Sequence, residues 1–256
     1  MGKKQILDKF YTKSEIAKYF IQKIDLSLYK NIIDPCAGAG AFSDQIENCL
    51  AFDIVPENEN IKQLDFFNFQ ENELEHPILT ISNVPFGVQS NLAISFFKKA
   101  STYSDTIAFI LPKSFKKESI QNKLPLNFHL DYEEDVPDNS FTLNGIVYNV
   151  PCVFQIWNKK DFIRTIDKKI PTTDLFSFTK KEEANVSIRR VGIFAGKAFI
   201  TNDKSKQSHY FIKTNIDAND FIKKINKIKW EHNNTVGPKS ISKKELIIEI
   251  IKNFRS

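Results

Sequence analysis

The chain has 256 residues, of which 41% are hydrophobic and 26% are charged. This length suffices to bury a full core, and it predicts one large domain or two smaller ones. No apolar run approaches the roughly 20 residues that a membrane helix needs. The first residues show no signal-peptide core, so we expect a cytoplasmic protein with no membrane partner.

The net charge of +5 is distributed unevenly along the chain. Residues 1–159 carry 15 Lys+Arg against 20 Asp+Glu, whereas residues 160–256 carry 21 against 11, including all four arginines. This asymmetry predicts a neutral-to-acidic catalytic part followed by a basic part that meets a polyanion such as nucleic acid. The alternative is a lysine-rich surface that is merely solvated.

The cysteines and histidines show no pattern typical of a redox or metal centre. Cys36, Cys49 and Cys152 are scattered, and the four histidines share no metal-ligand spacing. We therefore expect buried thiols and no metal site.

Residues 31–42, Asn-Ile-Ile-Asp-Pro-Cys-Ala-Gly-Ala-Gly-Ala-Phe, are the most informative stretch. A β-branched run ends in Asp34, a turn of small residues follows, and the pattern then predicts a helix over residues 42–50. Gly38 and Gly40 lack a Cβ, so the backbone can turn sharply and a ligand can approach its N–H groups. The pattern is typical of a strand–loop–helix unit that cradles a nucleotide-like ligand.

Upstream of this turn, residues 8–24 predict an amphipathic helix. Thr12 and Glu15 fit a capping box, with Thr12 as the N-cap and Glu15 as the third helical residue. Thr12 could therefore simply cap the helix. It could also help to hold a ligand carboxylate at the helix N-terminus.

Acidic residues close the next two predicted strands. Asp53 lies near the end of the strand predicted over residues 50–54, and it follows Asp34 by 19 residues. An acidic residue at about this spacing accepts the ribose hydroxyls of a nucleotide, although a surface Asp at a strand end is the alternative. Asp65 and Phe66 close a third strand over residues 61–64, where they could contact an adenine ring or simply form a turn.

The remaining elements complete an α/β pattern. Strands are predicted at 77–82, 106–111, 128–131 and 147–157, and a helix at 91–100. Asn144-Gly145 is a turn signal between the last two strands, which we expect to be antiparallel. Alternating strands and helices followed by a hairpin predict a parallel-rich sheet with an antiparallel edge. The pattern loosens afterwards, so we predict domains at 1–158 and 159–256, the second being a smaller basic α+β domain.

The fourth predicted strand runs into Asn83-Val84-Pro85-Phe86. Combined with the preceding Asp-Pro-x-x-Gly-x-Gly run, the acidic residues and Phe10-Tyr11-Thr12, this motif resembles the S-adenosylmethionine-dependent adenine-N6 methyltransferases. The motif order is similar to that of their gamma group, over roughly the first 157 residues. The resemblance implies a Rossmann-like class I methyltransferase sheet, mostly parallel with an antiparallel last strand, and S-adenosylmethionine as cofactor.

The resemblance also implies a role for each motif position. The cofactor would be bound by Tyr11, Thr12, Asp34, Cys36, Ala37, Gly38, Gly40, Asp53, Ile54, Asp65 and Phe66. The catalytic positions would be Asn83, Val84, Pro85 and Phe86. The Asn side chain and the Val carbonyl would accept hydrogen bonds from the target amino group, and Phe86 would stack on the flipped base. The family usually has proline where this chain has Val84, which supplies the carbonyl but not the fixed φ of proline.

The nucleic-acid contacts that we expect are Lys113, Phe141, Arg189, Arg190 and Lys197. Arginines can fork onto phosphates or a guanine edge, and aromatic rings can stack on bases. A solvated lysine and core packing are the alternatives for the first two. We interpret residues 159–256 as a target-recognition domain.

These observations favour a site-specific DNA adenine-N6 methyltransferase that acts on a flipped-out adenine. Its partner would be nucleic acid, DNA before RNA, and the resemblance allows for a cognate restriction endonuclease. An RNA adenine-N6 methyltransferase, a glutamine methyltransferase and a nucleic-acid-binding pseudo-enzyme remain open. The glutamine enzymes normally have tyrosine where this chain has Phe86, and a protein substrate needs no basic domain.

Overall fold

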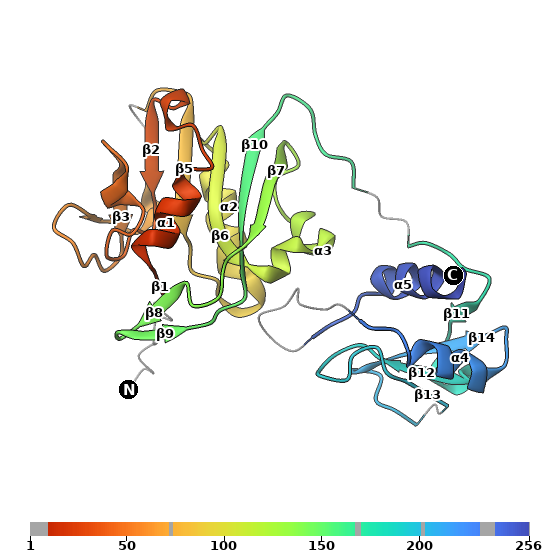
Figure 1. The fold of residues 1–256 in the computed structure, drawn as a ribbon. Coiled ribbons are helices and arrows are strands. Elements are labelled where there is room, and N and C mark those ends of the chain that lie inside the picture. The colour runs from red at the N-terminus through yellow and green to blue at the C-terminus, as the bar shows by residue number, and fades with distance from the viewer. Residues whose placement is uncertain (1–9, 72–73, 167–169, 201–202, 231–238, 256) are drawn as a thin grey trace, which may run out of the picture. The chain divides into compact units, whose positions relative to one another are not determined.

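The computed structural model describes residues 10–71, 74–166, 170–200, 203–230 and 239–255 (Figure 1). The chain divides into two compact units, residues 1–166 and 167–256. The sequence predicted the boundary at 158/159. Residues 160–166 bond back to the first unit: Lys160 N–H donates to the Asn127 carbonyl at 2.8 Å, and Arg164 Nε donates to the Phe128 carbonyl at 2.6 Å.

The first unit is built on a seven-stranded sheet of order β4-β3-β2-β5-β6-β10-β7. Strands β4, β3, β2, β5 and β6 run parallel, and β10 is antiparallel to both β6 and β7. The reversed strand β10 therefore lies between β6 and β7, which run parallel to each other. This strand order and these directions confirm the Rossmann-like class I methyltransferase fold. The strands are β2 (Asn31–Asp34), β3 (Leu50–Asp53), β4 (Lys62–Gln63), β5 (Ile78–Asn83), β6 (Thr106–Pro112), β7 (Phe128–Asp135) and β10 (Cys152–Lys159).

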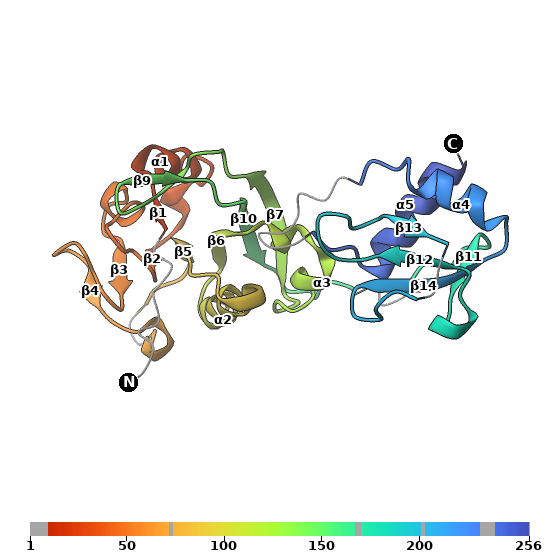
Figure 2. The ribbon, with the colours of Figure 1, turned by 90° about the horizontal axis from the view of Figure 1, so that it is seen from below.

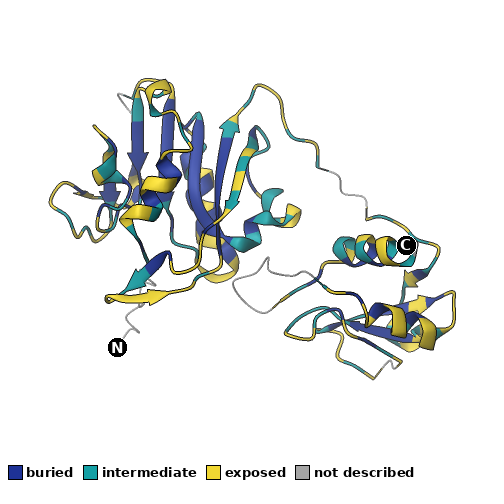
Figure 3. Cartoon of the chain, viewed as in Figure 1, coloured by how far each residue is buried: buried dark blue, intermediate teal, exposed yellow. Residues whose placement is uncertain are grey.

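Both faces of the central strands are covered, as Figure 3 shows by their burial. Every residue of β6 is buried, which is typical of a parallel strand between two layers. Alternate side chains enter different clusters: Ile107 and Phe109 pack with α2 (Asn91–Ala100), and Ala108 and Ile110 pack with α1 (Ser14–Ile21). The third helix of this unit is the short α3 (Glu118–Gln121).

A second, three-stranded antiparallel sheet has the order β1-β8-β9. It consists of β1 (Tyr11–Thr12), β8 (Phe141–Leu143) and β9 (Ile146–Tyr148). Asn144 and Gly145 join β8 to β9 with φ values of 50° and 75°, as a tight hairpin turn requires. The predicted turn is present, but it closes this separate hairpin rather than joining the last two strands of the large sheet.

Two local predictions at the start of the chain are wrong. The helix predicted over residues 42–50 is a single 3-10 turn, Ser43–Gln45, because the chain must already begin β3 at Leu50. The capping box is also absent. Thr12 lies in β1 opposite Phe141, and Lys13, at the N-cap of α1, makes no side-chain capping bond.

The second unit is an α+β domain with its own core. Its antiparallel sheet has the order β11-β14-β12-β13, and α4 and α5 pack against it (Figure 2). The helix α4 begins after Asp217, whose carboxylate accepts the N–H groups of Asn219 and Asp220 at 3.0 Å. The elements are β11 (Phe176–Phe178), β12 (Val186–Arg189), β13 (Ala198–Phe199), β14 (His209–Thr214), α4 (Ala218–Ile225) and α5 (Lys243–Arg255).

Within the described ranges, no helix combines the length and the apolar character needed to cross a membrane.

Candidate active site

Three polar side chains mark the carboxyl edge of the large sheet. Asp34 ends β2, Asp53 ends β3 and Asn83 ends β5, and these three strands are neighbours in the sheet. Open α/β sheets bind ligands beyond the carboxyl ends of their strands. The residues that the sequence singled out by position are therefore brought to one edge by the topology.

Asp34 is almost completely buried, with 1% of its surface exposed. Its Oδ1 accepts hydrogen bonds from Ser82 Oγ at 2.7 Å and from the Cys36 N–H at 3.3 Å. Burial raises the pKa of Asp34 to about 7, because these two bonds offset only part of the cost of desolvation and the charge of Asp53 adds to it. Such a carboxyl is ready to ionise when a cation arrives beside it.

The glycine turn follows Asp34 and fixes the second carboxylate. Gly38 has φ +56°, and its N–H donates to Asp53 Oδ2 at 2.9 Å. The Val55 N–H donates to Asp53 Oδ1, also at 2.9 Å. Gly40 has φ +95°, and a Cβ there would lie 2.4 Å from the Asp44 carboxylate. Both glycines thus have a backbone conformation that other residues rarely adopt, and a Cβ on Gly40 would also displace the Asp44 carboxylate.

The segment between Asp34 and the glycines is held by its backbone. Cys36 makes the N–H bond to Asp34, and the buried Ala37 donates its N–H to the Phe52 carbonyl at 2.9 Å. Burial raises the pKa of the Cys36 thiol well above its usual range, so the side chain stays protonated.

Tyr11 closes over this turn from β1. Its ring lies 3.5 Å from the position that a Cβ of Gly38 would occupy, and its hydroxyl is hydrogen-bonded to Glu57. The Glu57 N–H in turn donates to the Gly38 carbonyl at 3.1 Å. Burial and this hydrogen bond raise the pKa of Tyr11. Sequence reasoning missed Glu57, because nothing in its local pattern distinguishes it from a surface glutamate.

Thr12 and Ser43 each bury a hydroxyl that has no hydrogen-bond partner among the described residues. A buried hydroxyl without a partner is costly, and such groups are rare in folded proteins. Thr12 neighbours Tyr11, and the Ser43 backbone is close enough to Asp34 to lower the pKa of that carboxyl. Two unpaired donors beside a glycine turn and a buried carboxyl fit a polar ligand with acceptor groups.

Asn83 is oriented by a residue far away in the sequence. Its Nδ2 donates to the Phe10 carbonyl at 3.0 Å, and its Oδ1 accepts no hydrogen bond from the described residues. The next residue, Val84, is 1% exposed and packs with the aromatic core beside α2. The valine side chain therefore anchors the loop that proline would otherwise stiffen.

The loop after Asn83 has an unusual backbone. Gly87, Gln89 and Ser90 all have positive φ, between 53° and 66°. Ser90 Oγ is hydrogen-bonded to Ser114 Oγ at 2.8 Å, in the segment that follows β6. Val88 is 82% exposed at the loop surface. Phe86 is half-buried and packs on the cluster beneath α1. Nothing in the local sequence pattern predicted this conformation.

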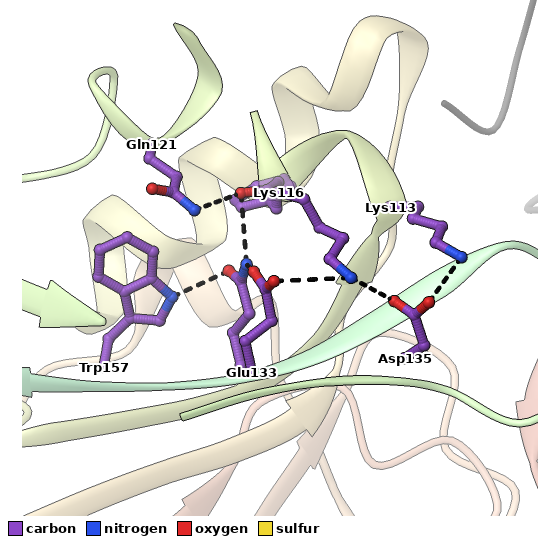
Figure 4. Close-up of polar contacts among 8 residues, drawn as sticks. Lys113, Lys116, Gln121, Glu133, Asp135 and Trp157 are labelled. Atoms are coloured by element: carbon purple, nitrogen blue, oxygen red, sulfur yellow. Dashed lines mark hydrogen bonds and ion pairs between the residues drawn. The ribbon is translucent and has the colours of Figure 1, made fainter. Parts of the chain in front are cut away.

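The segment after β6 is tied down by the polar network in Figure 4. Lys113 Nζ lies 2.8 Å from Asp135, and Lys116 Nζ lies 2.7 Å from the same carboxylate and 3.6 Å from Glu133. Lys113, a predicted nucleic-acid contact, is thus ion-paired within the first unit, with 17% of its side chain exposed.

The network continues into the sheet through Gln155, which is completely buried. Its Nε2 donates to Glu133 at 2.7 Å and to the Phe115 carbonyl at 3.3 Å, and its Oε1 accepts the Trp157 indole N–H at 3.0 Å. Gln121 also donates to the Phe115 carbonyl, at 2.8 Å. Every polar end of Gln155 is used, as burial demands.

The residues predicted around an adenine ring differ in exposure. Ile54 is 46% exposed, and Asp65 is exposed while its carboxylate accepts the Phe67 N–H at 3.0 Å. Phe66 is 1% exposed and stacks with Phe96 in the core. Phe67 is 41% exposed, so the accessible ring at this edge belongs to Phe67.

Phe141 is also a core residue, with 1% of its surface exposed. Tyr148, on the outer strand of the same hairpin, is 39% exposed and contacts the Phe10 ring edge-on at 5.6 Å. Because Phe10 also holds Asn83, Tyr148 is an accessible aromatic residue near Asn83. The sequence could not reveal this, since it depends on the pairing of β8 with β1.

The predicted contacts of the second unit lie around β12. Arg189 Nε donates to the Val191 carbonyl at 3.0 Å, and Arg190 donates to the Gln207 carbonyl at 2.7 and 3.1 Å. Lys197 is exposed, and its ammonium lies 5.8 Å from the rings of Phe194 and Phe199.

Among the described residues, no group of three or more His, Cys, Asp or Glu side chains could hold a metal ion.

No protein-family model matches this chain, and neither does any curated protein. Solved structures resemble it at low identity. One is a proposed RNA methyltransferase from Pyrococcus horikoshii, with 14% identity and a TM-score of 0.42 over 62% of this chain and 90% of the other. Another is a modification subunit of a proposed type I restriction enzyme from Vibrio vulnificus, with 14% identity and a TM-score of 0.46 over 61% and 46%.

A third similar structure is the 23S rRNA methyltransferase ErmE, with 14% identity and a TM-score of 0.43 over 61% of this chain and 71% of that one. Because all three TM-scores are below 0.5, these likenesses carry no argument about the chemistry of this chain.

Proposed function

We propose that this chain is an S-adenosylmethionine-dependent methyltransferase that modifies the N6 amino group of adenine in nucleic acid, with DNA as the preferred substrate. The observation that carries the proposal is the placement of Asn83. Its amide nitrogen is fixed by the Phe10 carbonyl at 3.0 Å, and its oxygen has no partner among the described residues, at the same sheet edge as Asp34 and the glycine turn. A free acceptor beside a ligand cradle is what amino-group methylation requires.

The residues at this edge fit the cofactor chemically. The unpaired hydroxyl of Thr12 would bond its carboxylate, the buried Asp34 would face its positive charge, and Asp53 would accept its ribose hydroxyls. Tyr11 and the backbone from Cys36 to Gly40 would enclose it. When bound, the cofactor supplies an electrophilic methyl group on a positively charged sulfur. For its adenine ring we propose Ile54, Asp65 and the exposed Phe67, in place of the buried Phe66.

The chemistry explains why two acceptors are needed. The amino nitrogen of adenine is a poor nucleophile because its lone pair is delocalised into the ring. Hydrogen bonds to Asn83 Oδ1 and to the Val84 carbonyl would favour a pyramidal nitrogen with a localised lone pair. They would also stabilise the positive charge that develops there. No covalent nucleophile is needed, so the protonated Cys36 has no chemical task.

A base inside a duplex cannot reach this edge and must be flipped out or supplied single-stranded. Pro85 and Phe86 follow Asn83-Val84 in the motif, and we assign Phe86 to one face of the target base. For the second face we propose Tyr148, since Phe141 is buried.

The second unit would hold the nucleic acid. Residues 167–256 carry 19 Lys+Arg against 10 Asp+Glu, an excess that complements phosphates. A basic domain of this size favours DNA over RNA, and it is a poor match to a protein substrate. A cognate restriction endonuclease is the partner that we propose for a DNA enzyme.

The test is methyl transfer from radiolabelled S-adenosylmethionine to double-stranded DNA, single-stranded DNA and total RNA in parallel, with the products digested to nucleosides. We expect label in N6-methyldeoxyadenosine from DNA. Label found in N6-methyladenosine from RNA alone would show that RNA, and not DNA, is the substrate. No label despite cofactor binding would identify a pseudo-enzyme.

The Asn83→Ala variant ties this activity to the proposed site. It should abolish methyl transfer, because the target amino group loses its side-chain acceptor. Cofactor affinity should stay within about threefold of the wild type, because Asn83 is assigned to the target base and not to the cofactor. The matched control is Asn91→Ala, an exposed asparagine at the start of α2. Full activity of Asn83→Ala would remove this residue from the mechanism.

A further inference from the structure

The turn between β12 and β13 exposes two large apolar side chains at its tip. Ile193 is 81% exposed and Phe194 is 57% exposed, in the sequence Gly192-Ile-Phe-Ala-Gly196. Single exposed apolar residues are common, but two large adjacent ones on one turn indicate a contact surface. Ile200, just after β13, is a further exposed residue of the same kind, at 58%.

This turn is held in one conformation by its backbone. The Gly196 N–H donates to the Arg189 carbonyl at 2.7 Å, Ala195 donates to Gly192 at 2.9 Å, and Lys197 donates to Phe194 at 3.0 Å. A Cβ on Gly196 would lie 2.3 Å from the Trp230 indole nitrogen, so the turn packs directly on that ring. The two apolar side chains are therefore presented by a firm base, which reduces the entropy lost on binding.

Two cations lie close to this turn. The Lys197 ammonium lies 5.8 Å from the Phe194 ring, and the Arg189 guanidinium would lie 3.6 Å from a Cβ on Gly192. Arg189 uses Nε for the Val191 carbonyl, which directs its guanidinium along the base of the turn. Apolar side chains next to cations complement a polyanion with an apolar interior, and a base-paired duplex is such a ligand.

We propose that Ile193 and Phe194 insert between stacked base pairs of the bound DNA, while Lys197 and Arg189 contact the flanking phosphates. Apolar wedges that enter a base step unstack and kink the duplex, and the bent duplex contacts more protein surface. The inference rests on the proposed function only in taking duplex DNA as the ligand. It adds that the second unit deforms the DNA as well as attracting it.

The experiment measures DNA unwinding without needing the recognition sequence. A nicked circular plasmid is sealed by ligase with increasing amounts of the full-length protein, and the linking number is read on a gel after the protein is removed. Insertion unwinds the helix, so the wild-type protein should shift the linking number in proportion to the amount bound. Binding is measured on the same plasmid by filter retention.

Three variants interpret the result. The double variant Ile193→Ser/Phe194→Ser should lose most of the shift and weaken binding roughly tenfold, because small polar side chains neither stack on bases nor separate a base step. Phe194→Leu should keep the shift, because a wedge needs bulk rather than an aromatic ring. The control is Ile248→Ser, another exposed isoleucine of this unit, on α5 at 47% exposure, which should behave as wild type.

The outcomes separate this inference from the proposed function. An undiminished shift in the double variant would assign the unwinding to base flipping elsewhere and overturn the wedge. A wild-type protein that binds and methylates DNA without any shift would also overturn it and leave the methyltransferase proposal standing. Binding of the tip to phosphatidylserine vesicles with none to DNA would make it a membrane contact and overturn the wedge.

Discussion

At the scale of single residues, Asp34 combines a cost to folding with a suggested task in binding. Its pKa near 7 lies above that of an unfolded aspartate, about 3.9. Between these pH values the folded state holds a proton that the unfolded state has released, so the free energy of unfolding falls as pH rises from about 4 to about 7. Asp34→Asn should remove this slope, stabilise the fold at pH 8 by a few kcal/mol, and sharply weaken cofactor binding.

The measurement is urea unfolding at several pH values, with cofactor affinity by calorimetry. The control is Asp138→Asn, an exposed aspartate in the loop before β8. If Asp34→Asn bound the cofactor as tightly as the wild type at pH 8, the carboxyl would have no part in recognising its charge.

Thr12 offers a second test of the same idea. Its Oγ1 is buried without a partner among the described residues, so Thr12→Val should stabilise the fold by about 1 kcal/mol. Valine also suits the strand β1. Cofactor affinity should fall about tenfold, because the ligand loses a hydroxyl donor. Urea unfolding measures the expected gain in stability, and calorimetry measures the expected loss of cofactor affinity. A loss of stability would show that the hydroxyl is paired in solution.

At the scale of elements, two glycines in different turns allow the cost of backbone strain to be separated from the cost of steric overlap. Gly40→Ala meets both a φ of +95° and an overlap with Asp44 at 2.4 Å, whereas Gly145→Ala meets a φ of +75° and nothing within 4 Å. Gly145→Ala should lower the free energy of unfolding by about 1–2 kcal/mol, the cost of a left-handed residue. Gly40→Ala should cost more and abolish cofactor binding. Equal effects in thermal unfolding would mean that Asp44 moves freely.

How far these elements follow from the sequence depends on the range of the interactions that define them. The helix predicted over residues 91–100 has the observed bounds, and the strands ending in Asp34 and Asp53 are where the apolar runs placed them. These elements are set by local pattern. The antiparallel pairing of β10 with β7 was also expected, although the Asn144-Gly145 turn used to predict it closes the β8–β9 hairpin instead.

The features that could not be predicted are set by distant partners. The Phe10 carbonyl that orients Asn83 is 73 residues away, and Thr12 joins a strand with Phe141 instead of capping a helix. Local pattern favoured the capping box, and the strand pairing overrode it. The burial of Phe66 and Phe141 could not be predicted either, because the residue type is the same for a phenylalanine that packs in the core and for one that contacts a ligand.

At the scale of the whole molecule, we expect lysines of the second unit to contact DNA and lysines of the first unit to form ion pairs within the protein. Lys197 is exposed in the basic unit, whereas Lys113 is ion-paired with Asp135 in a unit with an excess of acidic residues. A lysine that contacts a phosphate releases about one counterion on binding. Lys197→Gln should therefore weaken DNA binding and reduce the slope of log affinity against log salt by about 1.

Lys113→Gln is the matched control, since it removes the same charge from the chain. It should leave the salt slope unchanged and instead lower the free energy of unfolding by about 1 kcal/mol, because Asp135 loses a partner at 2.8 Å. Filter binding of plasmid DNA between 50 and about 200 mM salt measures both slopes. A reduced slope in Lys113→Gln would show that the ion pair opens and that this lysine contacts DNA, as its position after β6 first suggested. Equal slopes in both variants and the wild type would remove Lys197 from the phosphate contacts and leave the charge excess of the second unit to act at long range.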